Sequence, residues 1–325
     1  MAARVLVVGG AGYIGSVCAA VMAEAGFEVA SYDNLSTGHA EAVTGELFRG
    51  DIRDREHLTS VLKKGRFDAV MHFAAKSLVG ESVSHPLRYF DINVGGTATL
   101  LQAMQDAGVQ VLVFSSTCAV YGNPQYLPLD EAHPQAPVSP YGTSKGMVEK
   151  ILAASRAKED LRVTTLRYFN AAGCMPDGSL GESHKTETHL IPLAIAAGIG
   201  ARPPLSLFGE DYETRDGTCI RDYIHVLDLA DAHIKALNRL LEGHTGNAYN
   251  VGTGVGTTVR EVLASIGKCL GNEVPHEVTA RRDGDPPALF ARADLIKEEL
   301  GWEARWTDID DIVSTAVRWA RNPRF

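Results

Sequence analysis

Short apolar runs rich in β-branched residues alternate with helical patterns along the first half of the chain. This alternation is typical of right-handed crossovers, which build a parallel sheet covered by helices on both faces. The expected strands are 4–8, 27–32, 46–49, 69–73, 111–115 and 163–166, and the expected helices are 16–25, 53–64, 87–107 and 140–158. We therefore expect an α/β fold built on a doubly wound parallel sheet, with its ligand crevice beyond the carboxyl ends of the strands.

The turn between the first expected strand and helix carries evenly spaced glycines. Gly9, Gly12 and Gly15 form a G-x-x-G-x-x-G pattern, which lets a pyrophosphate approach the amides of a helix N-terminus. Asp33 ends the next strand, where a carboxylate accepts hydrogen bonds from the adenosine ribose and repels a 2′-phosphate. The pattern predicts a Rossmann dinucleotide site rather than a structural turn, and it favours NAD over NADP. Asp51 follows the third strand and is either an adenine contact or a solvated strand-end residue.

The pattern changes after residue 170. Residues 171–220 are rich in glycine, proline and polar side chains, with one apolar stretch at 190–199, and they are followed by an expected helix at 226–242 and strand at 248–251. We expect residues 1–170 to form the NAD-binding Rossmann domain and residues 171–325 a smaller mixed substrate domain. The segment of about 220–250 is expected to pack back onto the first domain.

Composition excludes several classes of protein. The 31 Lys and Arg residues against 40 Asp and Glu residues give a net charge of −9, whereas a general nucleic-acid or acidic-membrane binder would be positive. No apolar run is long enough for a secretory signal or a membrane span. The five cysteines are scattered without a C-x-x-C pair, which argues against a disulfide framework or a zinc site. We expect a cytoplasmic protein with no metal, no nucleic-acid partner and no membrane partner.

A tyrosine, a lysine and a threonine form the candidate catalytic group. Tyr141 and Lys145 are spaced i, i+4 on an expected helix, so their side chains share one face. A phenol is a poor base at neutral pH, but a nearby ammonium and the positive ring of an oxidised nicotinamide would lower its pKa. Thr117 follows an expected strand, and its hydroxyl could bond both a substrate oxygen and Tyr141. The group predicts removal of a hydroxyl proton while hydride leaves the same carbon; the alternatives are a surface Tyr–Lys pair and an ordinary turn threonine.

With these motifs together, the sequence resembles the extended short-chain dehydrogenase/reductase family and, more narrowly, its UDP-glucose (galactose) 4-epimerases. The resemblance covers essentially the whole chain. The matching segments are residues 9–15, 32–35, 50–52, 72–77, 79–82, 141–145, 167–170, 216–225, 281–286 and 300–302. It implies inversion at C4 of a UDP-sugar through a transient 4-keto sugar, with Tyr141 as the base, Lys145 holding the nicotinamide ribose and Thr117 completing the triad. It also implies a homodimer packed through the helices near 87–107 and 140–158.

The resemblance implies two sets of binding residues. The NAD set is Gly9, Gly12, Tyr13, Ile14, Gly15, Asp33, Asn34, Leu35, Ser36, Thr37, Gly38, Asp51, Ile52, Phe73, Ala74, Ala75, Lys76, Asn93, Ser115, Tyr141, Lys145, Tyr168 and Phe169. The UDP-sugar set, most of it in the second domain, is Ser77, Thr117, Tyr141, Asn170, His189, Leu190, Ser206, Phe208, Arg221, Tyr223, Val259, Arg282, Asp285 and Leu289. Arginines in this set would clamp the diphosphate within a net-acidic protein; the alternative is that they are solvated surface residues.

Four positions depart from the best-known family pattern. Val8 replaces a threonine, Ser77 stands where some members carry lysine, and His189 stands where others carry asparagine. Leu289 occupies a position that is tyrosine in some members and gates the space around the C2 substituent of the sugar. A smaller side chain there leaves room for an N-acetyl group.

Several functions remain open from the sequence. UDP-glucose and UDP-galactose are the expected substrates, and UDP-N-acetylglucosamine and UDP-glucuronate are alternatives. Nucleotide-sugar dehydratases and decarboxylases that resemble this chain carry acidic residues after the catalytic threonine to handle a C5 proton, whereas Cys118 and Ala119 stand here. A non-catalytic NAD-binding regulator would need the glycine turn but not the three catalytic side chains.

Overall fold

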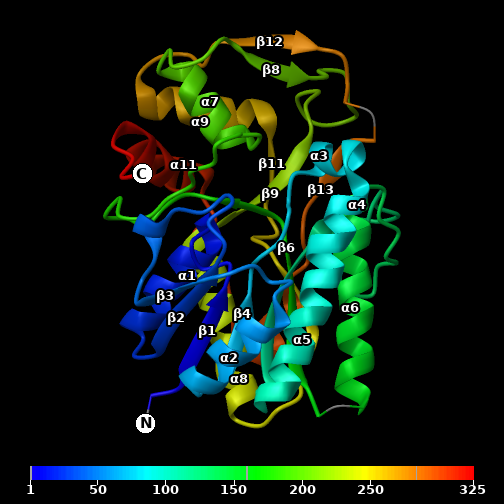
Figure 1. Ribbon diagram of the computed structural model, residues 1–325. Coiled ribbons are helices and arrows are strands. Elements are labelled where there is room, and N and C mark those ends of the chain that lie inside the picture. Colours follow the sequence, from blue (N-terminus) through cyan, green and yellow to red (C-terminus); the bar gives the residue numbers. More distant parts are fainter. Residues whose placement is uncertain (1, 159, 283) are drawn as a thin grey trace.

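The computed structural model describes residues 2–158, 160–282 and 284–325, and its largest element is a seven-stranded sheet (Figure 1). All neighbouring strands in this sheet run parallel. From edge to edge they are β10 (Ala248–Val251), β6 (Arg162–Tyr168), β5 (Val111–Thr117), β4 (Ala69–His72), β1 (Arg4–Val8), β2 (Glu28–Asp33) and β3 (Glu46–Arg49). The predicted doubly wound α/β sheet is confirmed.

The strand order reverses direction beside β1. The chain runs outward from β1 to β3 and then returns to place β4 on the other side of β1. The amide nitrogens of Phe73 and Ala74, just after β4, both donate to the Val8 carbonyl at 2.7 and 2.9 Å. This reversal is the position where open α/β sheets bind ligands, because the loops after β1 and β4 leave in opposite directions.

Helices cover both faces of the sheet because successive strand side chains point to opposite sides. Leu6 and Val8 pack against three helices on one face, and Val5 and Val7 pack against three on the other. The first group is α2 (Arg55–Gly65), α5 (Gly96–Ala107) and α6 (Pro140–Lys158), and the second is α1 (Tyr13–Glu24), α8 (Val226–Leu241) and α10 (Asp294–Leu300). Figure 1 shows α5 and α6 side by side along one flank of the molecule.

A smaller part of the molecule lies beyond the carboxyl ends of the large sheet (Figure 1). Its core joins three helices to short strands. The strands are β7 (Asn170–Ala172), β8 (Leu205–Phe208), β9 (Ile220–His225), β11 (Gly256–Thr258), β12 (His276–Thr279) and β13 (Ala288–Leu289), and the helices are α7 (Leu190–Gly198), α9 (Val259–Leu270) and α11 (Ile309–Arg321). Within the sequence assigned to this part, α8, β10 and α10 return to the large sheet. The functional division at residue 170 stays a prediction.

The helix expected over 87–107 is not uniform. It consists of α4 (Pro86–Tyr89), a wider π-helical segment η2 (Phe90–Gly95) and α5, preceded by a short α3 (Val79–Ser84). The extra residue of a π-turn shifts side-chain direction, which periodicity cannot reveal. The remaining elements are two 3₁₀ turns, Ala40–Ala42 and Cys118–Val120. Among the described residues, no helix combines the length and apolar character needed to cross a bilayer.

Candidate active site

The glycine turn joins β1 to α1 with very little space around two of its glycines. Gly9 has φ +90°, and a Cβ there would lie 2.4 Å from the Ala74 nitrogen. A Cβ on Gly15 would lie 2.2 Å from the Gly9 carbonyl oxygen. Gly12 differs, because its φ of −81° suits any residue and a Cβ there would meet only the Gly9 oxygen, at 3.5 Å. The protein itself therefore requires glycine at 9 and 15, whereas the space above Gly12 is left open.

That open space fits the pyrophosphate of a dinucleotide. Gly12 is the N-cap of α1, and among the described residues no side chain caps this helix end. The first amides of α1 therefore face the gap with the positive end of the helix dipole behind them. The predicted NAD site is consistent with this geometry, since a bound phosphate would supply the missing acceptors.

Asp33 holds the glycine turn from the end of β2. Its carboxylate accepts hydrogen bonds from the amides of Ala11 at 3.0 Å and Leu35 at 2.8 Å. Burial raises the pKa of Asp33, and these amide bonds oppose that shift. The predicted loop 34–38 folds over the turn, and a Cβ on Gly38 would lie 2.5 Å from the Ala11 carbonyl carbon. A carboxylate whose remaining lone pairs face this edge can accept two ribose hydroxyls.

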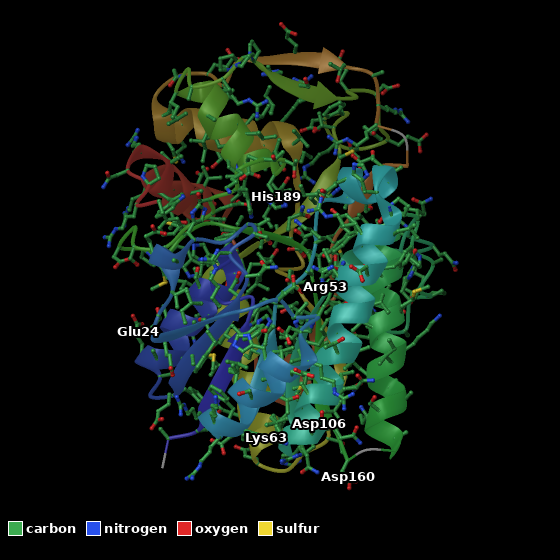
Figure 2. All side chains as sticks on the ribbon, viewed as in Figure 1. Glu24, Arg53, Lys63, Asp106, Asp160 and His189 are labelled. Atoms are coloured by element: carbon green, nitrogen blue, oxygen red, sulfur yellow. The ribbon has the colours of Figure 1, made fainter. Side chains whose placement is uncertain are left out.

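The loop after β3 completes the predicted adenine end of the site. The Asn34 side chain donates to Asp51 at 3.2 Å. Hydrogen bonds from Arg53 hold the pKa of Asp51 well below its usual range. Figure 2 shows Arg53 nearer the junction of the two parts, with Lys63, Asp106 and Asp160 at the opposite end of the molecule. Ile52 is buried in the core beside the sheet.

Asn93 fixes the loop after β4 from the π-helical segment. Its side-chain oxygen accepts from the Lys76 nitrogen at 2.8 Å, and its side-chain nitrogen donates to the Lys76 oxygen at 2.9 Å. The same nitrogen donates to the Ser144 hydroxyl at 2.9 Å. The buried Asn93 thus joins the predicted NAD loop 73–77 to the helix that carries Tyr141. The residues of that loop are half-buried except Ser77, which is exposed.

Lys145 enters the site from α6. Its ammonium donates to the Ser115 carbonyl at 2.7 Å and lies 4.8 Å from the centre of the Phe114 ring. Lys145 is 4% exposed, and this burial lowers its pKa to about 7, opposed by Glu149. The lysine is therefore anchored to the end of β5, on the same helical face as Tyr141.

Tyr141 and Thr117 are brought together at the end of β5. Both side chains are buried. Burial raises the pKa of the Tyr141 phenol to about 12, and a hydrogen bond with Thr117 acts in the opposite direction. The i, i+4 spacing predicts that Lys145 lowers this pKa, but in the structure the lysine donates to Ser115 and burial has the larger effect on the phenol. The fold therefore brings the predicted base beside Thr117 but does not by itself lower the pKa of its phenol.

His233 supports the site and was missed by the sequence analysis. Its Nδ1 lies 2.8 Å from the Leu229 carbonyl, so Nδ1 carries the hydrogen and Nε2 accepts from the Ser115 hydroxyl at 3.0 Å. Its ring also lies 4.7 Å from that of Phe73. Burial lowers the pKa of His233 to about 4, which keeps it neutral. No sequence signal could have found it, because it sits in a helix far along the chain.

Arg221 is the central cation of the predicted UDP-sugar set. It lies on β9 in an ion pair with Asp285, and its strand partner in β13 is Leu289. Leu289 packs in one apolar cluster with Phe169 and Cys118, the residue that follows Thr117. The predicted clamp and the predicted sugar gate are thus adjacent to the loop after β5.

The other predicted UDP-sugar residues surround this strand. Arg282 stacks on the exposed ring of Phe208 at 4.3 Å. The rest occupy neighbouring elements. Asn170 of β7 pairs with the buried Tyr223 of β9, and Ser206 is exposed on β8. His189 and Leu190 lie at the start of α7, and Val259 lies at the start of α9. Figure 2 places His189 near the junction between the two parts of the molecule. The Nδ1 atom of His189 pairs with Glu182.

Comparison with known proteins gives the family. A family model described as the NAD dependent epimerase/dehydratase family matches residues 5–252, which is more than half of the chain. The chain belongs to this family. The epimerase resemblance predicted from the sequence motifs is thereby confirmed.

Relatives within the epimerase/dehydratase family are similar along almost their whole length. A UDP-glucose 4-epimerase of Rhizobium leguminosarum bv. trifolii is 51% identical over 97% of this chain and 96% of its own. The crystal structure of UDP-glucose 4-epimerase from Brucella ovis in complex with NAD is 49% identical with a TM-score of 0.96, covering 98% of this chain and 99% of that one. A UDP-glucose 4-epimerase from Stenotrophomonas maltophila, with bound NAD and formylated UDP-arabinopyranose, is 41% identical with a TM-score of 0.95, covering 98% of each chain.

Proposed function

We propose that this chain is an NAD-dependent UDP-glucose 4-epimerase, which interconverts UDP-glucose and UDP-galactose through a transient 4-keto sugar. The observation that carries the proposal is the position of Tyr141. Its buried phenol lies beside Thr117 at the carboxyl end of β5. Near-full-length similarity to UDP-glucose 4-epimerases supports it, as do the NAD and UDP-sugar bound in two of the related structures.

In this mechanism the residues of the chain transfer one proton and hold the sugar and the cofactor in position. NAD, when bound, supplies the oxidant that takes hydride from C4 of the sugar and returns it to the opposite face. The Tyr141 oxygen takes the proton of the 4-hydroxyl in the first half of the reaction and returns it in the second, so no net oxidation occurs. Thr117 bonds the same substrate oxygen, and Lys145 holds the nicotinamide ribose from its anchor on Ser115.

The UDP clamp is the second requirement, because the sugar must turn over while the nucleotide stays bound. Arg221 is paired with Asp285 and is largely buried, so its guanidinium is held in one place. The N–H groups of this guanidinium that are not used within the protein are available to donate to the diphosphate. Arg282, Phe208 and Leu289 complete the proposed pocket from three neighbouring segments.

The test of function is a product assay with three substrates. Purified protein is incubated with UDP-glucose, UDP-N-acetylglucosamine and UDP-glucuronate, and the sugars are resolved. UDP-galactose as the main product supports the proposal. Conversion of one of the other two alone would assign a different sugar, and turnover of none would favour a binding protein.

The open space at Gly12 gives a prediction for cofactor binding. We expect Gly12→Val to fold normally, because φ suits valine and the protein leaves room for Cβ. The larger side chain would occupy the proposed pyrophosphate space and weaken NAD binding by roughly 100-fold, about 2.7 kcal/mol. Fluorescence titration with NAD and a melting curve check the two effects.

Gly15→Ala serves as the contrasting variant, because its Cβ would lie 2.2 Å from the Gly9 oxygen. We expect a large loss of thermal stability there. Unchanged NAD affinity in Gly12→Val would show that the pyrophosphate lies elsewhere.

We also propose that the enzyme is a homodimer packed through the helices near α4 and α6. Apolar side chains are exposed together there, with Val83 65% and Leu87 81% exposed, and Met147 of α6 exposed nearby. Exposed apolar side chains gathered on neighbouring helices are typical of an interface.

We also propose a cytoplasmic location, which agrees with all five cysteines being free.

If the enzyme is a homodimer packed in this way, a single charge introduced at Leu87 should dissociate it. We expect Leu87→Glu to convert the dimer into a monomer, because two carboxylates would be buried across a symmetric interface. Light scattering measures the mass directly, and the exposed Val278→Glu on β12 is the matched control. A wild-type protein that is already a monomer would contradict the proposal.

A further inference from the structure

Four side chains of ligating type converge in the loop before α7. Glu182, His184, Glu187 and His189 each place one ligand atom within 4.8 Å of those of the others. The His184 Nδ1 lies 3.1 Å from Glu187 and 3.5 Å from Glu182, and the His189 Nδ1 lies in direct contact with Glu182 and 3.6 Å from Glu187. Both imidazoles therefore direct the same nitrogen at the same two carboxylates.

The charge in this cluster favours a cation. The Glu182 and Glu187 side chains are 8% and 20% exposed, and among the described residues their ion pairs are with the two histidines only. Buried carboxylates are stable when they are paired with positive charge or coordinate a metal. Metal-bound imidazoles are neutral, so the two carboxylates of an occupied site would carry a charge of −2, which a divalent ion balances. Without an ion, burial lowers the pKa of His189 but the contact with Glu182 outweighs it and raises that pKa to about 9, so the ion would displace a proton.

The spacing suits a transition metal. Ligand atoms around a tetrahedral zinc ion, with bonds of about 2.0–2.1 Å, lie about 3.3 Å apart. Three of the four His–Glu separations in the cluster are close to this value, and the fourth, between His189 and Glu182, is a direct contact that an ion would have to open. We propose that Glu182, His184, Glu187 and His189 form a binding site for a first-row divalent transition metal ion, with zinc as the best fit. Imidazole and carboxylate ligands together favour such an ion over calcium or magnesium, which prefer oxygen alone.

The surroundings of the cluster are those of a built site. The amides of Thr188 and His189 both donate to one oxygen of Glu187, at 2.7 and 2.8 Å. The Trp319 indole donates to the Glu182 carbonyl at 2.7 Å, which fixes the loop to α11. Such second-layer bonds orient ligands before a metal arrives.

An entry path is also present. A cavity of about 270 Å³ is lined by three of the four proposed ligands, together with Trp319 and Phe325. Glu182, His184 and Glu187 line this cavity, so an ion could reach the cluster through it. Glu182, His184 and Glu187 lie outside the predicted NAD and UDP-sugar sets, whereas His189 belongs to the predicted UDP-sugar set. All four ligands belong to the loop that leads into α7, and an ion would hold that loop in place.

Cobalt titration tests the proposal directly. The untagged protein is stripped with a chelator and titrated with Co²⁺, which absorbs in the visible range when bound in a tetrahedral site. We expect saturation at one ion per chain, displacement of the colour by Zn²⁺, and a higher melting temperature with Zn²⁺ than without it. None of these readouts requires NAD or a sugar, so failure here leaves the proposed epimerase function untouched.

Co²⁺ binding by single-substitution variants identifies the residues that bind the ion. His184→Gln is expected to weaken Co²⁺ binding by at least about tenfold, and Glu187→Gln to do the same with nearly unchanged side-chain volume. His244→Gln, in an exposed His–Glu pair elsewhere, is the matched control and should bind as the wild type does. Absence of saturable cobalt binding, or equal binding in wild type and both cluster variants, would overturn the site and leave the four residues as hydrogen-bonded His–Glu pairs.

Discussion

Tyr141→Phe is expected to lower the turnover of UDP-glucose by about 10²- to 10⁴-fold, the range typical of losing a positioned base. The substitution removes one oxygen and keeps the ring that packs in the site, so NAD binding should persist. Steady-state kinetics with a coupled assay for UDP-galactose measures the loss, and NAD fluorescence measures retention of the cofactor.

Tyr126→Phe is the matched control, because this tyrosine is exposed and its hydroxyl donates only to Asp130. It should turn over substrate at the wild-type rate. Near-normal activity in Tyr141→Phe would remove the base assignment even if the family membership stands.

Lys145→Met is expected to stabilise the ligand-free protein while lowering turnover by about 100-fold or more. Burial lowers the pKa of Lys145 from 10.5 to about 7. At neutral pH this corresponds to a cost of up to about 4 kcal/mol against the unfolded chain, where the lysine keeps its proton. Methionine fills similar space without a charge but loses the bond to Ser115, so we expect a net gain of about 2 kcal/mol.

The pH dependence of this gain identifies its cause. Between about pH 7 and 10.5 the unfolded lysine binds a proton that the folded one has released, so the wild type becomes more stable as pH rises. The advantage of Lys145→Met should therefore be largest near neutral pH and shrink toward pH 10. Denaturant unfolding at several pH values checks this, with the exposed Lys150→Met on the same helix as control. A gain that does not change with pH would have another origin.

The parts of the site that could be predicted from the sequence are those set by local geometry. The glycine turn, the carboxylate ending β2 and the Tyr141–Lys145 pair depend on short spacings, and each lies where the pattern placed it. The roles assigned to the NAD and UDP-sugar residues stay predictions, although most of these residues lie at or beyond the carboxyl ends of the strands of the large sheet.

The parts that could not be predicted depend on contacts across the chain. His233 meets Ser115 only because α8 returns to the sheet after a long excursion. The pKa of Lys145 depends on how deeply the helix is buried, which no i, i+4 spacing reveals. Likewise the four ligating side chains before α7 gather because that loop is folded against α11.

The return of α8 and β10 to the large sheet has a consequence for how this protein is made on the ribosome. A nascent chain that has emerged only as far as residue 170 leaves β6 as a bare outer strand, with no β10 to pair with it. One face of the sheet also lacks α8, whose apolar side chains cover Val5 and Val7. We therefore expect the dinucleotide half not to fold by itself, so that completion of its sheet waits until roughly three quarters of the protein, through β10, has been synthesised.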